Sequence, residues 1–207
     1  MRIIAGSWRG RSIVSPKGDD TRPTSDRTRE ALFSMLASRF GSFEGVRVLD
    51  LFAGTGALGL EALSRGAAYA TFVERERQAL DVLKVNVAKL AAPGTTDIRG
   101  QGVEALGPLY GSRYDLVLID PPYLSGGGGA LLERLARLGW FAPGALVSVE
   151  TGKAEVVAAK GFEQDTDRVH GKAKLTLLRW VGGDEAPVAA KVEAVDEEDA
   201  VEDEAED

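Results

Sequence analysis

The sequence predicts an α/β protein built on one doubly wound, mostly parallel sheet with helices on both faces. Apolar strand-like segments alternate along the chain with segments whose apolar residues recur at helical spacing. The run 116–119, Leu-Val-Leu-Ile, is apolar on both faces, as is typical of a strand that helices cover on each side. With 44% apolar residues among 207, the chain has the material for one sizeable core.

Each element follows from its local pattern. The segment 26–39 starts at a residue suited to helix capping, Ser25 or Asp26, and repeats apolar residues at helical spacing. The last two strands, 162–169 and 174–180, are joined by His-Gly-Lys and are expected to form an antiparallel hairpin at the sheet edge. The other expected strands are 46–52, 70–74, 97–99, 114–120 and 145–150, and the other expected helices are 57–65, 77–90 and 130–138.

Two end segments flank this predicted core. Segments 3–5 and 12–14 enclose a Gly-Ser-Trp-Arg-Gly turn and predict a small β-hairpin, which is too short to be stable alone. From about Gly182 the chain lacks periodicity and cannot bury enough apolar area to offset its conformational entropy. We therefore expect an extension of hairpin and helix at 1–40, a main domain at 41–182 and a disordered acidic tail at 183–207.

Composition excludes several classes of site. The chain has no cysteine, so it can form neither a disulfide nor a thiolate metal site, and a single histidine cannot make a metal cluster alone. No segment approaches the roughly 20 consecutive apolar residues of a membrane span, and the N-terminus lacks the apolar stretch of a signal peptide. We expect a cytoplasmic monomer that binds neither a metal ion nor a membrane.

The formal charge of −7 is misleading, because acidic residues concentrate at one end of the chain. From Asp184 onward there are 12 acidic residues against Lys191 alone, so the rest of the chain carries 24 basic and 20 acidic residues. Residues 1–39 hold eight basic and four acidic side chains, which accounts for the whole positive excess. A phosphate backbone would dock there, although a solvated basic face explains four charges equally well.

A glycine-rich turn follows the first predicted strand. Gly54, Gly56 and Gly59 have the spacing of a dinucleotide-binding turn between a strand and a helix. The backbone at the first two glycines can approach a ligand closely, and the third lets the helix pack near the strand. Glu74 ends the next strand, where its carboxylate would accept both hydroxyls of a ribose. This pattern suits nicotinamide cofactors as well as S-adenosylmethionine.

Asp50 stands directly before the turn and favours S-adenosylmethionine. Its carboxylate would face the cationic methionine end of that cofactor, whereas it would repel the pyrophosphate of a nicotinamide dinucleotide. We therefore expect S-adenosyl-L-methionine as the cofactor. A purely structural turn and a nicotinamide-dependent oxidoreductase are the alternatives.

A second motif, Asp120-Pro121-Pro122-Tyr123, follows the strand 114–120, at the edge where open α/β sheets bind ligands. An exocyclic amine on a nucleic-acid base is a poor nucleophile, so it needs acceptors that hold its hydrogens and orient its lone pair. Asp120 offers a carboxylate, Pro121 a stiffened backbone carbonyl, and Tyr123 a ring on which an extruded base can stack. The four residues are the predicted catalytic corner. The glycines at 126–129 then suggest either a mobile flap or a plain linker.

Seven stretches of the sequence are specific in combination. They are 2–6 (Arg-Ile-Ile-Ala-Gly), 8–11 (Trp-Arg-Gly-Arg), 22–24 (Arg-Pro-Thr), 26–27 (Asp-Arg), 29–33 (Arg-Glu-Ala-Leu-Phe), 50–67, which contains the glycine turn, and 120–123. On these residues the chain resembles the bacterial 16S ribosomal RNA guanine-N2 methyltransferases, and the match covers roughly residues 2–181. The resemblance implies a class I, Rossmann-like, S-adenosylmethionine-dependent methyltransferase.

The resemblance also implies the substrate and the site residues. The substrate would be a guanine, methylated at N2, in the 16S ribosomal RNA of a small ribosomal subunit or its assembly intermediate. The implied cofactor contacts are Asp50, Phe52, Gly54, Gly56, Glu74, Gly102, Val103 and Asp120. The implied RNA contacts are Trp8, Arg9, Arg11, Arg22 and Arg27.

Two positions depart from the family pattern. Similar proteins often place Asp or Asn after the third strand to contact the adenine, where this chain has Gly102, so adenine recognition would rest on backbone groups. Near the final hairpin the family usually has Tyr-Gly, where this chain has His170-Gly171. Two other functions suit the same motifs: a DNA adenine or protein-amide N-methyltransferase, and a non-catalytic ribosome assembly factor.

Overall fold

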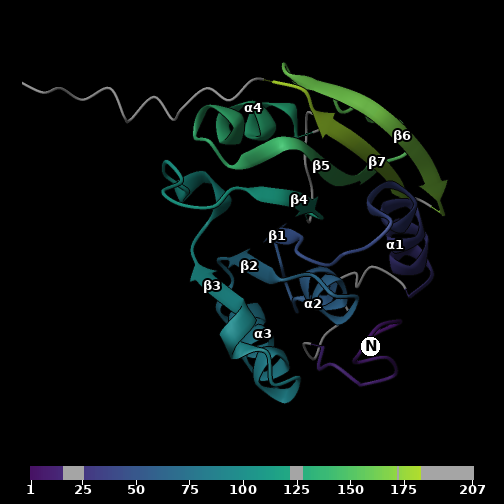
Figure 1. The fold of residues 1–207 in the computed structure, drawn as a ribbon, viewed down its shortest axis with the longest axis vertical. Helices are drawn as coiled ribbons and strands as arrows, with labels where there is room; N and C mark the ends of the chain where they lie inside the picture. Colours follow the sequence, from purple (N-terminus) through teal and green to yellow (C-terminus); the bar gives the residue numbers. More distant parts are fainter. Residues whose placement is uncertain (16–25, 122–127, 172, 183–207) are drawn as a thin grey trace, which may run out of the picture.

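The computed structural model describes residues 1–15, 26–121, 128–171 and 173–182, whose arrangement is shown in Figure 1. Its helices are α1 (Asp26–Phe40), α2 (Ala57–Ser64), α3 (Arg77–Lys89) and α4 (Gly129–Arg137), with 3-10 turns at Pro93–Thr95 and Val103–Ala105. Its strands are β1 (Arg47–Leu51), β2 (Tyr69–Glu74), β3 (Thr96–Gly100), β4 (Tyr114–Ile119), β5 (Phe141–Gly152), β6 (Phe162–His170) and β7 (Ala173–Trp180). Every helix and strand expected between residues 26 and 180 is present.

The seven strands form one sheet in the order β3-β2-β1-β4-β5-β7-β6. Neighbouring strands from β3 to β5 are parallel, and β7 runs antiparallel to both β5 and β6. The predicted doubly wound, mostly parallel sheet with an antiparallel edge hairpin is confirmed. The winding of the chain reverses between β1 and β4, so the crevice outside their carboxyl ends is where such a sheet binds its ligand.

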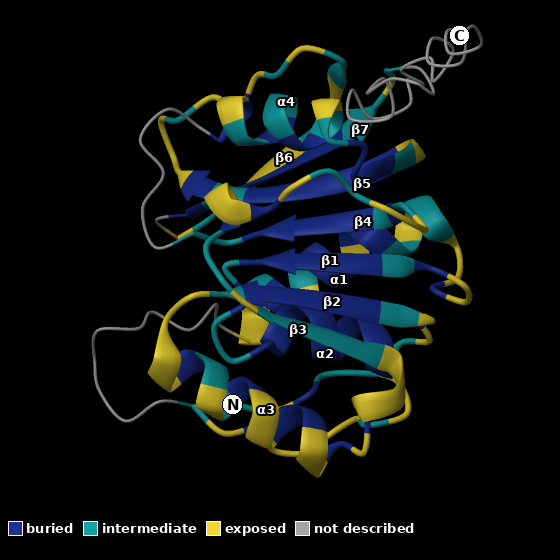
Figure 2. Ribbon diagram, turned by 90° about the vertical axis from the view of Figure 1, so that its left-hand side faces the viewer, coloured by how far each residue is buried: buried dark blue, intermediate teal, exposed yellow. Residues whose placement is uncertain are grey.

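Helices cover both faces of the sheet, and each face has its own apolar cluster. On one face α1, α2 and α3 pack against strand residues such as Val48, with Leu83 contributed by α3. On the other face α4 packs against strand residues such as Leu49 and Val147. Figure 2 shows β1, β2 and β4 almost wholly buried, whereas α3 and α4 each expose one side. In the described parts of the chain, no helix has the length and apolar character needed to cross a bilayer.

The N-terminal segment, residues 1–15, differs from the hairpin predicted at 3–5 and 12–14. The chain reverses direction there, but it forms one isolated antiparallel bridge, between Arg2 and Ser12, and no strand. The predicted small β-hairpin is therefore wrong in its extent. A single bridge cannot hold the segment in place, so its position depends on contacts with the main domain.

Several of those contacts are made with α2. The N–H groups of Ile4 and Ala5 donate to the two carboxylate oxygens of Glu61 at 2.7 and 3.0 Å. The N–H of Trp8 donates to the Ser64 hydroxyl oxygen at 3.0 Å, and that hydroxyl donates to the Ala5 carbonyl at 2.5 Å. Three backbone hydrogen bonds join residues 1–3 to residues 10–13, but the N–H groups of Ile4, Ala5 and Trp8 bond to helix side chains, so the ladder does not extend further.

β5 begins earlier than the strand predicted at 145–150. Phe141 pairs with Tyr114 of β4 before the pairing register shifts, so the strand starts ahead of Pro143 and Gly144. These two residues interrupt the apolar pattern and are typical of turns, which is why the sequence indicated a later start.

A β-bulge in β6 connects the C-terminal hairpin to α1. The pairing of β6 with β7 skips Asp165, whose carboxylate instead accepts the Nε–H of Arg39 on α1 at 2.7 Å. Arg179 of β7 contacts the other oxygen of the same carboxylate at 3.5 Å. A bulge turns a side chain out of the ladder, and here it fixes α1 against the sheet edge.

Candidate active site

The turn between β1 and α2 has an unusual backbone conformation. Phe52, Gly54 and Gly56 have φ angles of 58°, 54° and 78°, so alternate residues lie in the left-handed region. This conformation is uncommon for a bulky residue such as Phe52. The neighbouring Ala53 helps to hold it, because its N–H donates to the Val73 carbonyl of β2 at 3.1 Å. Backbone strain of this kind clusters at functional sites, which makes the turn a candidate ligand contact.

The three glycines of the turn have different roles. A Cβ atom on Gly59 would overlap the ring of Phe72, and one on Gly56 would overlap the side chain of Leu83. These two glycines therefore allow α2 to pack closely on β2 and α3. Among the described residues beyond its chain neighbours, a Cβ on Gly54 would meet no atom closer than 3.9 Å. The open space beside Gly54 leaves its backbone accessible to a ligand.

Glu74, at the end of β2, is bonded directly to the glycine turn. Its Oε2 accepts the N–H of Gly54 at 2.8 Å, and its Oε1 accepts the N–H groups of Arg75 and Glu76, each at 2.8 Å. The structure thus brings together two predicted site residues from different strands. Because a carboxylate has about four acceptor sites, Glu74 keeps capacity for a further donor such as a ribose hydroxyl.

Asp50 lies beneath the turn and is only 2% exposed. Its Oδ2 accepts the N–H of Gly59 at 2.9 Å, which ties the end of β1 to α2. Burial raises the pKa of the Asp50 carboxyl well above its usual range; the Gly59 hydrogen bond opposes this shift, and the negative charges of Asp120 and Glu74 add to it. A positive charge beside the turn would therefore stabilise the ionised carboxylate.

Asp50→Asn should weaken the pH dependence of stability. Because the folded-state pKa of Asp50 lies above its unfolded value, its contribution to stability is complete below the unfolded pKa and is lost as the pH rises through the folded one. The asparagine carbonyl can still accept the Gly59 N–H, but it carries no charge.

Urea unfolding from about pH 4 to about pH 8 checks this prediction. Across that range the wild type should lose free energy of unfolding relative to Asp50→Asn. A constant difference between the two proteins would show that the Asp50 carboxyl is not perturbed.

The second predicted motif lies beside the turn. β1 and β4 are paired in parallel register up to Leu51 and Ile119, so Asp120 and Pro121 follow at the level where the turn begins. Both residues are partly exposed, and the Asp120 charge acts on Asp50. Among the residues that the structure describes, no group of three or more His, Cys, Asp or Glu side chains is arranged to hold a metal ion.

Some predicted features lie outside the described residues. They are Pro122 and Tyr123 of the catalytic corner, Arg22 of the RNA-binding set, the first two glycines of the predicted flap and the acidic segment 183–207. The geometry of the corner therefore rests on Asp120 and Pro121.

The loop after β3 carries Gly102 and Val103. The carboxylate of Glu104 fills the space that a Cβ atom on Gly102 would need, and Arg75 contacts that carboxylate at 3.4 Å. Arg134 of α4 donates to the Val103 carbonyl at 3.2 Å, which connects the loop to the helix. The loop beside Gly102 thus carries a carboxylate, which Glu104 supplies from two residues further along the chain.

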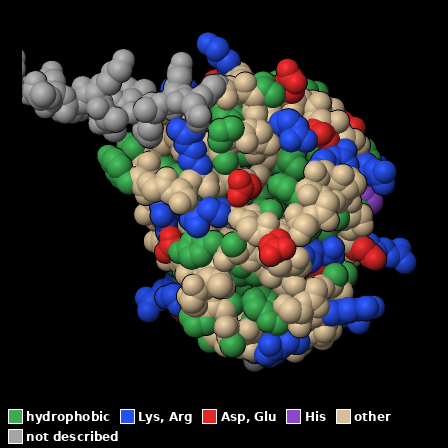
Figure 3. Space-filling view, viewed as in Figure 1, with side chains coloured by type: hydrophobic (Ala, Val, Ile, Leu, Met, Phe, Trp, Pro, Cys, Tyr) green, Lys and Arg blue, Asp and Glu red, His purple; other side chains and the backbone are tan. Residues whose placement is uncertain are grey.

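The predicted RNA-binding residues of the N-terminal part differ in how exposed their side chains are and in whether those side chains already contact other parts of the protein. Arg9 and Arg27 have exposed side chains. Arg11 is also exposed, but its guanidinium donates to the Lys89 carbonyl at the end of α3 at 2.6 Å, and Trp8 packs partly buried against the core. Figure 3 shows Lys and Arg side chains spread around the molecule rather than gathered in one patch on the face it presents. Arg9 and Arg27 are thus the described members of the set best placed to meet a phosphate.

Comparison with known proteins identifies the family. The family model described as conserved hypothetical protein 95 matches residues 1–179. The chain belongs to this family. Its relative in Escherichia coli (strain K12), named ribosomal RNA small subunit methyltransferase D, is 41% identical over 155 residues, which are 73% of this chain and 74% of the relative. The resemblance that the sequence motifs indicated is confirmed.

Solved structures agree with this assignment. The Escherichia coli protein yhhF, 36% identical, superimposes with a TM-score of 0.76 over 87% of this chain and 97% of its own. Magnesium protoporphyrin IX methyltransferase from Synechocystis PCC 6803 is 17% identical, with a TM-score of 0.56 over 74% of this chain and 78% of that enzyme. The second likeness concerns the fold alone, and together they confirm the class I methyltransferase architecture.

Two buried polar residues of this methyltransferase were missed by sequence reasoning. Glu61 and Asn86 are both fully buried, and both bond to the N-terminal segment. Each occupies a helix position whose neighbours are apolar core residues. A polar side chain at an apolar position of the helical repeat is the signal that could have found them.

Proposed function

We propose that this chain transfers a methyl group from S-adenosylmethionine to the exocyclic N2 of a guanine in 16S ribosomal RNA. Its family makes it a ribosomal RNA methyltransferase, since a relative named for that activity is 41% identical over nearly three quarters of the chain. Asp120 lies beside the glycine turn, at the carboxyl ends of β1 and β4. This position is the observation that supports an exocyclic amine as the methyl acceptor.

The residues of the turn fit S-adenosylmethionine. The open backbone at Gly54 allows close approach, and Glu74 retains acceptor capacity for the ribose. Asp50 and Asp120 supply negative charge near the cationic methionine end, while the Gly102 loop lies beyond β2 on the side left for the adenine. When bound, this cofactor supplies a methyl group that its sulfonium already activates.

Asp120 and Pro121 prepare the nitrogen of the base. The Asp120 carboxylate accepts one N–H of the exocyclic amine and the Pro121 carbonyl accepts the other, so the lone pair is held away from the ring. The nitrogen would form a bond to the methyl carbon as the carbon–sulfur bond of the donor breaks, which leaves S-adenosylhomocysteine, and the nitrogen would lose one proton to Asp120 or to water. Pro122 and Tyr123 would complete the corner, with the tyrosine ring stacked on the base. Positioning of the amine nitrogen against the methyl group supplies most of the rate enhancement.

Three parts of the chain have different roles. Residues 1–40 bind RNA from the small ribosomal subunit or its assembly intermediate, and residues 41–182 bind the cofactor and carry out the transfer. The acidic segment 183–207 has no catalytic role, and its charge is consistent with keeping the protein soluble.

The test of this proposal is a comparison of methyl acceptors. Small ribosomal subunits from cells lacking the protein, duplex DNA and a ribosome-free protein fraction are each incubated with the enzyme and S-adenosylmethionine labelled in its methyl group. Label is expected in the 16S RNA of the subunits. Label confined to DNA or protein would establish another N-methyltransferase, and binding to subunits without transfer would establish an assembly factor.

Arg9→Ala and Arg27→Ala should each weaken binding to small subunits, because each substitution removes a cation that neutralises an RNA phosphate. The slope of log affinity against log salt should become shallower by about 0.7–0.9 in each variant. Arg137→Ala is the matched control, because it removes the same charge from the exposed end of α4, which packs on the opposite face of the sheet from α1 and residues 1–15. An equal decrease of affinity in all three variants would argue against a phosphate site in the N-terminal part.

A further inference from the structure

Asn86 connects two parts of the protein that are far apart in sequence. It is fully buried on α3, where its Oδ1 accepts the N–H of Val14 at 2.7 Å. Its Nδ2 group donates to the Val14 carbonyl at 3.1 Å and to the Thr55 carbonyl at 2.9 Å. Val14 belongs to the N-terminal segment and Thr55 to the glycine turn, so one amide holds both.

The contact with Thr55 bears on the shape of the turn. Thr55 stands between Gly54, whose N–H bonds to Glu74, and Gly56, whose N–H donates to the Ala53 carbonyl at 2.7 Å. Because the peptide unit is planar, holding the Thr55 carbonyl also fixes the direction of the following N–H. Asn86 therefore helps to set the backbone that faces the proposed cofactor.

The free-energy cost of burying an asparagine within a helix indicates that Asn86 has a specific role. Asparagine is a weaker helix former than leucine, and burying an amide is unfavourable unless its groups are bonded. At Asn86 both N–H donors and the carbonyl acceptor are used, and every bond goes to the backbone of another segment. Movement of either segment would leave buried polar groups without partners, so the two segments are expected to move together.

We propose that Asn86 is a positioning residue that couples the N-terminal segment to the glycine turn. Cofactor binding at the turn then stabilises the docked N-terminal segment, and RNA bound to that segment strengthens cofactor binding by the same factor. The RNA half of this inference rests on the proposed function. The cofactor half concerns only the chain and S-adenosylmethionine or its demethylated product.

Amide hydrogen exchange in the wild type tests the cofactor half without RNA. Saturation with S-adenosylhomocysteine should slow exchange of the Val14 amide by about fivefold or more, since coupled sites typically differ by such factors. Exchange in the glycine turn should slow as well. If the turn becomes protected while the Val14 amide exchanges at an unchanged rate, the proposal is overturned.

Asn86→Asp tests whether Asn86 itself carries the coupling. The side chain keeps its size, but an oxygen replaces the donor group that faces the carbonyls of Val14 and Thr55. Ser12→Ala is the matched control, because it removes the 2.8 Å hydrogen bond from Lys89 to the Ser12 hydroxyl, which joins α3 to the N-terminal segment without touching the turn. Protection of Val14 by S-adenosylhomocysteine should disappear in Asn86→Asp and persist in Ser12→Ala.

If Asn86→Asp does not fold, Asn86→Ala carries the test, since its truncation admits water to the freed backbone groups. Protection that survives in a folded Asn86 variant would contradict the proposal.

Calorimetric titration with S-adenosylhomocysteine, with and without small subunits, measures the RNA half. The affinity should rise with subunits in the wild type and in Ser12→Ala, and it should be insensitive to them in the folded Asn86 variant. An enzyme that shows Val14 protection but methylates no subunit RNA would contradict the proposed function alone. An enzyme that methylates subunit RNA without Val14 protection would contradict the coupling alone.

Discussion

Asp120→Asn should lower kcat for methyl transfer by about a thousandfold, within the range expected for loss of a positioned proton acceptor. The variant retains a polar side chain of the same size, but it can neither carry negative charge nor take up the proton that the amine loses. Affinity for S-adenosylhomocysteine, measured by calorimetry, should change by less than about tenfold, because the glycine turn and Glu74 are untouched.

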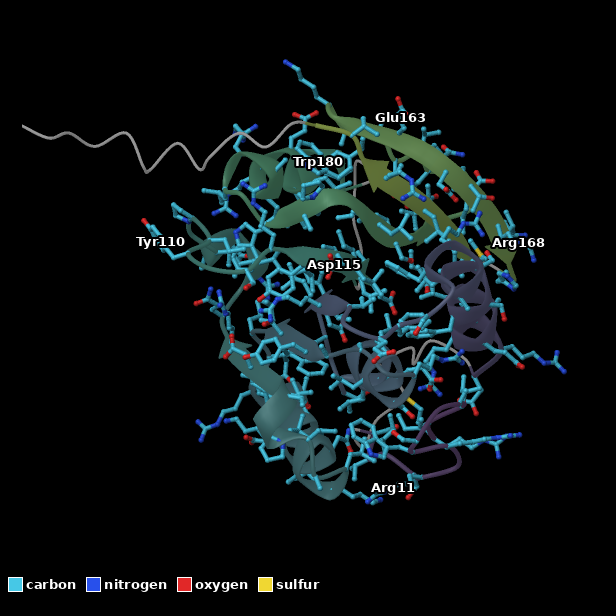
Figure 4. All side chains as sticks on the ribbon, in the orientation of Figure 1. Arg11, Tyr110, Asp115, Glu163, Arg168 and Trp180 are labelled. Atoms are coloured by element: carbon cyan, nitrogen blue, oxygen red, sulfur yellow. The ribbon has the colours of Figure 1, made fainter. Side chains whose placement is uncertain are left out.

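Asp115→Asn is the control for this substitution. Asp115, labelled in Figure 4, lies near the start of β4, whereas Asp120 follows the end of that strand. The Oδ2 atom of Asp115 accepts the N–H of Arg47 at 2.8 Å. An asparagine carbonyl can replace that acceptor, so kcat should change by less than about twofold. If Asp120→Asn retained wild-type kcat, Asp120 would have no part in handling the amine.

Glu61→Ala should cost about 3 kcal/mol or more in free energy of unfolding, because it leaves several groups without partners. The carboxylate is fully buried and accepts the N–H groups of Ile4 and Ala5, and it also accepts the Nε–H of Arg65 at 2.8 Å. Its loss should release the N-terminal segment from α2. Urea unfolding measures the cost, and faster hydrogen exchange in residues 1–15 would report the release.

Glu30→Ala provides the comparison, since it makes the same chemical change at an exposed position of α1. Its effect should stay within about 0.5 kcal/mol. Were Glu61→Ala to cost no more than Glu30→Ala, the docking of the N-terminal segment would depend on its other contacts and not on this carboxylate.

The alternation of strands and helices, and the glycine turn that follows β1, could be predicted from the sequence because their signals are local. A strand, a glycine turn and a helix occupy consecutive residues, and Glu74 ends the very next strand. The pairing of Gly54 with Glu74 then follows from parallel neighbours whose carboxyl ends share one edge. The pattern of neighbouring residues was therefore sufficient to predict this contact.

The N-terminal segment could not be predicted in the same way. Its short apolar stretches are compatible with a hairpin, but its actual partners are Glu61 and Ser64, more than 50 positions away. Asn86 likewise bonds to Val14 across 72 positions. A buried polar residue shows in a sequence only as a break in the apolar repeat, and that break does not reveal which backbone groups it satisfies.

Nucleoside mass spectrometry of small-subunit RNA tests the central claim most directly. Subunits from cells lacking the protein are analysed before and after incubation with the purified chain and S-adenosylmethionine, with Asp120→Asn as the control. We predict that N2-methylguanosine appears in 16S RNA with the wild type and stays at background with the variant. The appearance of N6-methyladenosine, or of no methylated nucleoside at all, would contradict the account.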